Sequence, residues 1–192
     1  YINPVLVPSL LDPEENRQLA LEIAQASIIL LKNDGLLPLK KDLKTLVIIG
    51  PNAREGLHLH GDYSYSVHIP SVQAWKGKKA VWQDSVNTVN IFEGIKNKLP
   101  QGEVLYAKGC DLSGNSQEGF EEALEIAKKA QVIVAVMGEN SGLFQQSISG
   151  EGSDRSDLEL PGMQGKLLRE LSRLNKPIIL VLVNGRPLAL QW

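Results

Sequence analysis

Four acidic side chains and one arginine stand close together in the segment SGEGSDRSDLELPG, residues 149–162. The segment lies downstream of an apolar run, VIVAVMG, that is typical of a buried strand, and Glu139 comes directly after that run. Paired carboxyl groups, one ionised and one protonated, perform acid–base chemistry such as the cleavage of glycosidic bonds. The protonated member needs a pKa raised by apolar or like-charged surroundings. Glu151, flanked by two glycines, is the candidate proton donor, because a mobile loop can carry it into such a cleft.

The same segment has a simpler interpretation. Loop acids are mostly solvated, and carboxyl groups with perturbed pKa values are a minority among them. On this interpretation Asp154 and Arg155 form local ion pairs and Glu151 does no chemistry. The residues alone leave both interpretations open.

Aromatic side chains gather between the first predicted strand and the next helix. Tyr63 and Tyr65 lie in GDYSYS, and Trp75 and Trp82 follow. Flat rings with a polar edge suit the apolar faces of sugars, and they equally suit the packing of a long loop onto its own domain. Tyr63, Tyr65 and Trp75 are therefore candidate substrate-binding residues, with ordinary packing as the alternative.

The three histidines of the chain, His58, His60 and His68, fall in the same segment. Histidines at close spacing can bind zinc, but no carboxylate-rich or cysteine pattern completes a site here. Solvated or locally hydrogen-bonded loop histidines are the favoured interpretation, and no metal is expected.

Short apolar runs alternate with helical patterns along the chain. Strands are predicted at 45–50, 103–108, 131–138 and 176–185. Helices are predicted at 86–99, 116–130 and 164–174. This alternation predicts an α/β fold, a three-layer sandwich around a mostly parallel, doubly wound sheet. Ligands of such sheets bind beyond the carboxyl ends of the strands, so the candidate functional edge carries the loops after Gly50, Lys108, Gly138 and Gly185.

Two stretches fall outside this alternation of strands and helices, residues 1–40 and residues 51–85. Residues 1–40 are interpreted as an interdomain segment with a first helix, which Asn33 and Gly35 are expected to end. Residues 41–192 are interpreted as a partial sandwich domain. Within it, residues 51–85 are expected to be irregular, far longer than a usual connection, and therefore functional or inserted.

Composition and motifs exclude several classes of protein. The net charge is −2 with scattered basic residues, so no nucleic-acid partner is expected. No apolar run approaches the roughly 20 residues that cross a bilayer, so no membrane partner is expected. No strand is followed by GxGxxG or by GxxxxGKS/T, and GxSxG is absent. The single cysteine, Cys110, excludes a disulfide scaffold. Because the chain lacks an initiator Met, we expect it to begin inside a longer polypeptide. Because it stops after a strand-like segment with no closing helix, we also expect it to be truncated before its last elements.

Six segments carry a family resemblance: ASIILLKNDGLLPLKK, LVIIGPNA, GDYSY, VMGE, SGEGSDRSDLELPGMQ and KPIILVLVNGRPLALQW. In this order they resemble the second domain of glycoside hydrolase family 3, over residues 26–192. The combination of the first segment with GRPLAL is specific to that family.

The resemblance implies a retaining, exo-acting β-glycosidase of the β-glucosidase or β-xylosidase type, usually secreted or periplasmic. Its substrate would be a β-linked oligosaccharide or glycoside, and no cofactor or metal is implied. An N-terminal barrel domain of the same polypeptide would carry the nucleophilic aspartate, and a six-stranded α/β sandwich would supply the acid/base glutamate. No nucleophile motif occurs in this chain, so the chain alone is expected to be inactive.

The family's acid/base glutamate maps onto Glu151, in the SGEG segment. Glu139 matches the family's glutamate at the strand end, and with Asp154 and Arg155 it is expected to support the site without touching the substrate. The stretch from Gly138 to Ser149 is longer than in many relatives, which leaves the reach of Glu151 open. The alternative function is a carbohydrate-binding or structural module without catalytic residues.

Overall fold

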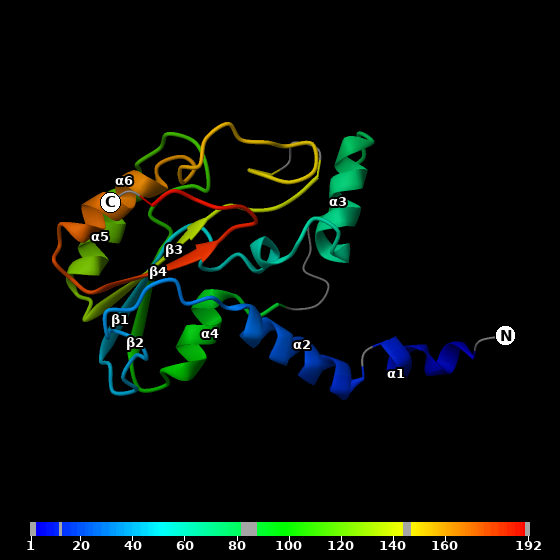
Figure 1. Cartoon of the computed structure of the whole chain (residues 1–192), viewed down its shortest axis with the longest axis horizontal. Coiled ribbons are helices and arrows are strands. Elements are labelled where there is room, and N and C mark those ends of the chain that lie inside the picture. The colour runs from blue at the N-terminus through cyan, green and yellow to red at the C-terminus, as the bar shows by residue number, and fades with distance from the viewer. Residues whose placement is uncertain (1–2, 12, 82–87, 144–146, 191–192) are drawn as a thin grey trace. The chain divides into compact units, whose positions relative to one another are not determined.

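The computed structural model describes residues 3–11, 13–81, 88–143 and 147–190 (Figure 1). They form two compact units, residues 1–39 and residues 40–192. The first unit contains two short helices, η1 (Pro4–Leu6) and α1 (Val7–Leu11), and the fourteen-residue helix α2 (Glu14–Ser27).

The end of α2 corrects one prediction. The helix ends at Ser27 and does not continue to Asn33, because the β-branched Ile28 and Ile29 follow and Ile28 is extended, with φ −75° and ψ 121°. Asn33 instead forms a turn of its own, in which its side-chain oxygen accepts the backbone N–H of Gly35 at 3.1 Å.

A four-stranded parallel sheet is the centre of the second unit, with the strand order β2-β1-β3-β4. Its strands are β1 (Thr45–Ile49), β2 (Glu103–Ala107), β3 (Val132–Gly138) and β4 (Ile178–Val183). In the register, Val47 of β1 pairs with Leu105 of β2 and with Ile133 of β3. The predicted parallel α/β sheet is confirmed, and the described residues contain four of the six strands that the family resemblance implies.

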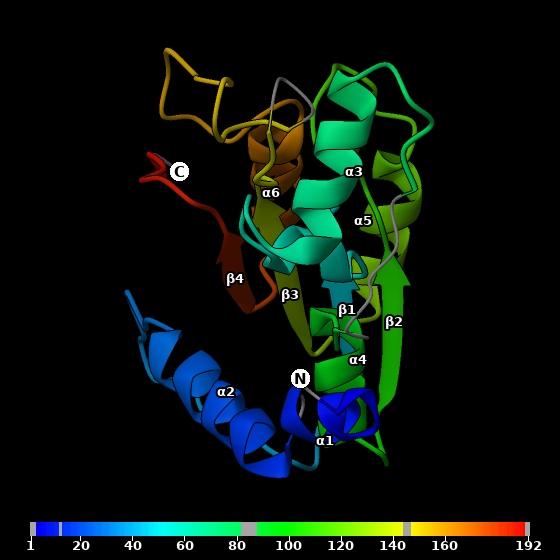
Figure 2. The ribbon, with the colours of Figure 1, turned by 90° about the vertical axis from the view of Figure 1, so that its right-hand side faces the viewer.

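Helices cover both faces of the sheet (Figure 2). On one face lie α5 (Phe120–Lys128) and α6 (Gln164–Ser172), whose apolar sides join the main core. On the other face lies α4 (Ile91–Lys98), whose Phe92 ring meets the Tyr106 ring with centroids 5.7 Å apart. Tyr106 follows Leu105, which joins the α5–α6 core, and neighbouring strand residues point to opposite faces. The three-layer sandwich is therefore as predicted.

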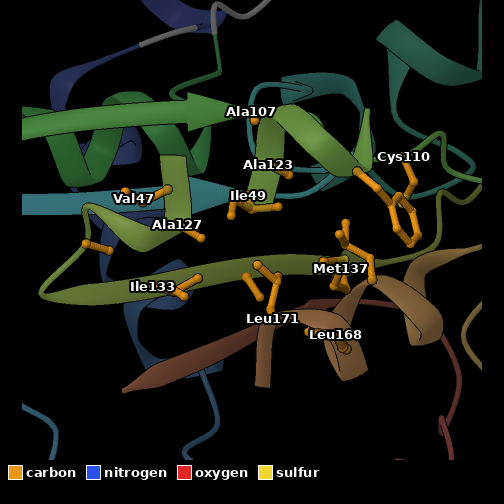
Figure 3. Close-up of a cluster of buried hydrophobic side chains, with 14 residues drawn as sticks. Val47, Ile49, Ala107, Cys110, Ala123, Ala127, Ile133, Met137, Leu168 and Leu171 are labelled. Carbon is orange, nitrogen blue, oxygen red and sulfur yellow. The ribbon is translucent and has the colours of Figure 1, made fainter. Parts of the chain in front are cut away.

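The main core fills the space between the sheet and the helices α5 and α6 (Figure 3). Ile49, Ile133 and Met137 from the strands pack there with Leu168 and Leu171 of α6, all fully buried. Burying one side chain of this size stabilises the fold by about 1.5–3 kcal/mol.

Residues 51–85 contain more regular structure than predicted. They include the short helix η2 (Gly56–Leu59) and the eleven-residue helix α3 (Tyr65–Trp75). Figures 1 and 2 show α3 beyond the carboxyl ends of β1 and β3. The prediction of an irregular stretch is thus wrong for 65–75, where Pro70 inside the helix concealed the helical pattern.

Gln164, the first residue of α6, determines how β3 ends. Its fully buried carboxamide accepts the N–H of Gly138 and donates to the oxygens of Gly138 and Leu112, each at 2.8 Å. A side-chain amide thereby satisfies backbone groups that a neighbouring strand would otherwise pair. The loop after β3 starts from a fixed point for this reason.

None of the helices in the part of the chain that the structure describes has the length and apolar character needed to span a membrane.

Candidate active site

Two strands end in glycines at the edge where the candidate residues lie. Gly50 follows β1 with φ 138°, and Gly138 closes β3 with φ 129°. A Cβ atom on Gly50 would collide with the carbonyl oxygen of Val136, and one on Gly138 with that of Val183. Glycine is required at both positions because the neighbouring backbones approach so closely.

Glu139, the residue after β3, is buried with 1% of its surface exposed. Its carboxylate faces the guanidinium of Arg186, with Arg186 Nη2 2.6 Å from Oε1 and Nε 3.0 Å from Oε2. Ser149 Oγ donates to Oε2 at 3.1 Å. Hydrogen bonding to Glu139 raises the pKa of Arg186. A carboxylate closed in this way has no free face for a substrate.

The same arginine ties the long loop to the sheet. Arg186 Nη1 donates to the carbonyl oxygen of Asp157 at 2.6 Å. Arg186 itself follows β4, so one side chain joins the ends of β3 and β4 to the loop. Sequence reasoning missed this role, although Arg186 lies in GRPLAL directly after Gly185, at the edge that the strand pattern had marked.

Short backbone bridges shape the loop around Glu151. Ser141 and Ser149 form a parallel bridge, and Gly150 and Ser153 pair antiparallel, with the Gly150 N–H 3.0 Å from the Ser153 oxygen. Gly150 has φ 142°, and a Cβ there would collide with the carbonyl oxygen of Gly142. Glu151 is therefore presented at the tip of a tight turn.

Glu151 is exposed, in contrast to Glu139. Two residues just before α3 hold it. Its backbone N–H donates to Asp62 Oδ2 at 3.1 Å, and the hydroxyl of Tyr63 donates to its Oε2. Among the residues that the structure describes, none hydrogen-bonds to the other carboxylate oxygen, Oε1. Asp62 is a second contact that sequence reasoning missed, and its only signal was its place in GDYSYS.

Arg155 forms an ion pair within the same loop. Its partner is Asp157, with Nη2 of Arg155 lying 2.8 Å and 3.1 Å from the two carboxylate oxygens. The hydrogen bond from Arg155 lowers the pKa of Asp157. Asp154 is exposed and lines, with Arg155 and Ser153, a hollow of about 460 Å³.

The candidate aromatic rings are exposed. The exposed fractions are 69% for Tyr63, 71% for Tyr65 and 62% for Trp75, while Trp82 lies outside the described residues. Tyr63 stacks on His68, with ring centroids 5.7 Å apart and an interplanar angle of 29°. The three side chains are exposed, and their role in sugar binding stays a prediction.

The histidines do not converge on one point. His58 Nδ1 lies 2.6 Å from Asn52 Oδ1, and His60 Nε2 lies 2.7 Å from Thr88 Oγ1. Burial lowers the pKa of His58. Within 3–11, 13–81, 88–143 and 147–190, no three histidine, cysteine or acidic side chains gather as a metal site would require.

The arrangement separates two carboxyl groups at one edge of the sheet. Glu139 is closed by an arginine and a serine, while Oε1 of the exposed Glu151 has no hydrogen-bond partner in the described part of the chain. An open carboxyl group of this kind can give or take a proton. Cleavage of a glycosidic bond requires a second carboxyl group beside the sugar.

Comparisons with known proteins agree on one family. Residues 28–192 match the family model described as glycosyl hydrolase family 3 C-terminal domain. A β-xylosidase of Formosa agariphila is 38% identical over 93% of this chain and 23% of that protein. A periplasmic β-glucosidase of Salmonella typhimurium is 32% identical over 91% of this chain and 23% of that protein. The chain thus spans about a quarter of the length of these relatives.

A solved structure agrees with the sequence relatives. It is a family 3 exo-β-xylosidase in complex with a xylobiose aziridine activity-based probe. It matches with a TM-score of 0.66 and 32% identity, over 86% of this chain and 18% of that chain.

Proposed function

The chain belongs to glycosyl hydrolase family 3, whose C-terminal domain it carries, and from this premise we propose that Glu151 is the acid/base residue of a retaining β-glycosidase. The observation that supports this role is the open Oε1 of Glu151 at the carboxyl edge of the sheet, beside a Glu139 that Arg186 closes. The nucleophile would be an aspartate of an N-terminal barrel domain in the same polypeptide.

The proposed reaction has two steps. In the first, the nucleophilic carboxylate bonds to the anomeric carbon while Glu151 gives its proton to the departing glycosidic oxygen. In the second, Glu151, now a carboxylate, takes a proton from water, whose oxygen attacks the anomeric carbon and releases the nucleophile. Glu151 ends protonated, ready for the next cycle.

The substrate class proposed is a β-linked glycoside cleaved from its non-reducing end, with glucose and xylose as the candidate sugars. The names of the relatives support both sugars. A site outside the cytoplasm is proposed with it, since one relative is named as periplasmic. The exposed rings of Tyr65 and Trp75 also fit a carbohydrate-binding module, which is the second candidate.

The test is Glu151→Ala in the full-length protein that carries this chain. Substrates with poor leaving groups need protonation in the transition state, so their hydrolysis should slow by about 10² to 10⁴-fold. An activated aryl glycoside should still form the glycosyl-enzyme, which then accumulates because the water attack has lost its base. Azide, which needs no deprotonation, should restore turnover of that intermediate.

The matched control is Glu159→Ala, an exposed acid of the same loop, which should leave both substrates and the azide response unchanged. If Glu151→Ala slowed the hydrolysis of substrates with good and poor leaving groups equally, with no azide effect, the acid/base residue would be another acid. Absence of any hydrolysis by the unmodified full-length protein, together with retained sugar binding, would favour the binding module.

A further inference from the structure

Two chain segments that are far apart in sequence meet at Glu151. Asp62 and Tyr63 precede α3, whereas Gly150 and Glu151 lie in the loop after β3. The two segments are joined by one hydrogen bond to the backbone of Glu151 and one to its side chain. These two hydrogen bonds orient Glu151 without burying it, since neither removes its carboxyl group from solvent.

The Tyr63 side chain is fixed at both ends. Its ring stacks on His68, one turn into α3, at a centroid distance of 5.7 Å. Its hydroxyl donates to Oε2 of Glu151. A phenol held in this way occupies one carboxylate oxygen and leaves the other, Oε1, as the oxygen that can hold a transferable proton.

Asp62 fixes the backbone on the other side of the turn. Its Oδ2 accepts the Glu151 N–H at 3.1 Å. The approach depends on Gly150, because a Cβ at that position would lie 2.8 Å from the same oxygen. A hydrogen bond to a carboxylate is stronger than one between neutral groups, so in the folded protein this contact can set the place of the turn.

From this geometry we propose that Asp62 and Tyr63 are the positioning residues of Glu151. Asp62 sets the place of its backbone, and Tyr63 directs Oε1, rather than Oε2, to the glycosidic oxygen and later to the attacking water. The inference rests on the proposed function, since it concerns the same carboxyl group. It gives Tyr63 a task that depends on its hydroxyl, in contrast to sugar stacking, which would depend on its ring.

The first test is Tyr63→Phe in the full-length protein, because this change removes the hydroxyl and keeps the ring. The hydrogen bond that is lost is made to a charged group, and such bonds contribute enough free energy that kcat for a poor leaving group should fall about tenfold. The KM should change by less than about twofold, since binding of the ground state keeps its ring contact. An activated aryl glycoside should be glycosylated at nearly the original rate.

Tyr106→Phe is the matched control. It removes a tyrosine hydroxyl from β2, where the ring packs on Phe92 and Arg54, and it should leave both substrates unaffected. Thermal unfolding of both variants shows whether either change acts through stability. For the second positioning residue, Asp62→Asn keeps an acceptor oxygen and should retain more activity than Asp62→Ala.

A double-mutant cycle completes the test. In the Glu151→Ala background, with turnover restored by azide, Tyr63→Phe should have no further effect, because the group that it positions is gone. An unchanged effect of Tyr63→Phe in that background, or a change in KM alone, would overturn the positioning role and favour a sugar-binding one. No effect of Tyr63→Phe, while Glu151→Ala shows azide rescue, would also overturn it and leave the proposed function standing. If azide did not restore turnover in Glu151→Ala itself, the proposed function would be overturned, and the positioning role with it.

Discussion

Glu139 and Glu151 lie on the same edge of one sheet, yet their surroundings are opposite. Glu139 is 1% exposed and receives hydrogen bonds from Arg186 and Ser149. Glu151 is exposed and receives one bond from Tyr63 and none from an arginine in the described residues. We call Glu139 with Arg186 and Ser149 the closed region, and Glu151 with Tyr63 and Gly150 the open region. The difference teaches that the closed region supports the fold, whereas the open region can support chemistry.

The closed region is also the more connected one. The backbone oxygen of Glu139 accepts from Asn52 Nδ2 at 3.3 Å, and Asn52 in turn contacts His58. Arg186 extends the same network to Asp157. A change in one member should therefore reach several elements, while a change at Glu151 should stay local.

The largest expected difference in stability is between Glu139→Ala and Glu151→Ala. Removing one partner of a buried ion pair leaves an uncompensated charge, so Glu139→Ala should lower the local stability of β3 by about 3–5 kcal/mol. Glu151→Ala should change it by less than about 0.5 kcal/mol, as surface substitutions do. Native-state hydrogen exchange at the amides of Val132–Gly138 measures both, even in a multidomain protein.

Glu139→Gln is the milder variant if Glu139→Ala does not accumulate as folded protein. It keeps a hydrogen-bond acceptor for Arg186, so the local stability of β3 in this variant should lie between those of the two alanine variants. Equal protection of β3 in the variants of both glutamates would show that the two regions do not differ as described.

A second, smaller effect is expected at the glycines of the open region. Gly150→Ala places a side chain at φ 142° and against the carbonyl oxygen of Gly142, a strain of about 1–3 kcal/mol. The turn should shift and displace Glu151, so kcat for poor leaving groups should fall while the exchange of β3 amides stays unchanged. Gly61→Ala is the control, because a Cβ there meets no atom within 4 Å. Comparable losses for both glycines would contradict the proposed tight presentation of Glu151.

The smallest effect expected is a pH dependence of the closed region. Burial is the main cause that lowers the pKa of His58 from 6.5, and Lys108 adds to it while Glu55 opposes it. The unfolded state therefore binds the proton at a higher pH than the folded state. The stability is full above pH 6.5 and is lost as the pH falls through the pKa of the folded state.

His58→Gln, compared with the unmodified protein in thermal unfolding from pH 7.5 down to pH 5, should remove this loss below pH 6.5. Parallel curves for the two proteins throughout this range would show that His58 is not the cause. The activity assigned to Glu151 should not depend on this substitution.

The strands could be predicted from the sequence to within a few residues. Their runs are continuous and rich in β-branched residues, as in TLVII and VIVAVMG, and such runs fit a strand buried on both faces better than any other element. Helix boundaries were less accurate. The helix predicted at 86–99 occupies Ile91–Lys98, since Asn90 caps it by accepting the N–H of Glu93 at 2.9 Å.

The candidate site was predictable in its residue types and not in its contacts. The order of the strands places Glu139, Glu151 and Gly185 at one edge, and that much follows from a parallel sheet. Which glutamate is closed depends on Arg186, which lies 47 residues from Glu139. Local sequence patterns carry no information about such a pair, and the same holds for the contact between Asp62 and Glu151.

The separation of the residues that hold Glu151 has a consequence for folding. Its contacts with Asp62 and Tyr63 span 89 and 88 residues, a range that includes β2, α5 and β3. Contacts across such long separations form late, after the elements between them have come together. They are also among the first to open, because they consist of two hydrogen bonds at the surface. A molecule can therefore have its sheet and core fully folded and still lack an oriented Glu151, so we expect this orientation to be the last feature gained on folding and the first lost on warming.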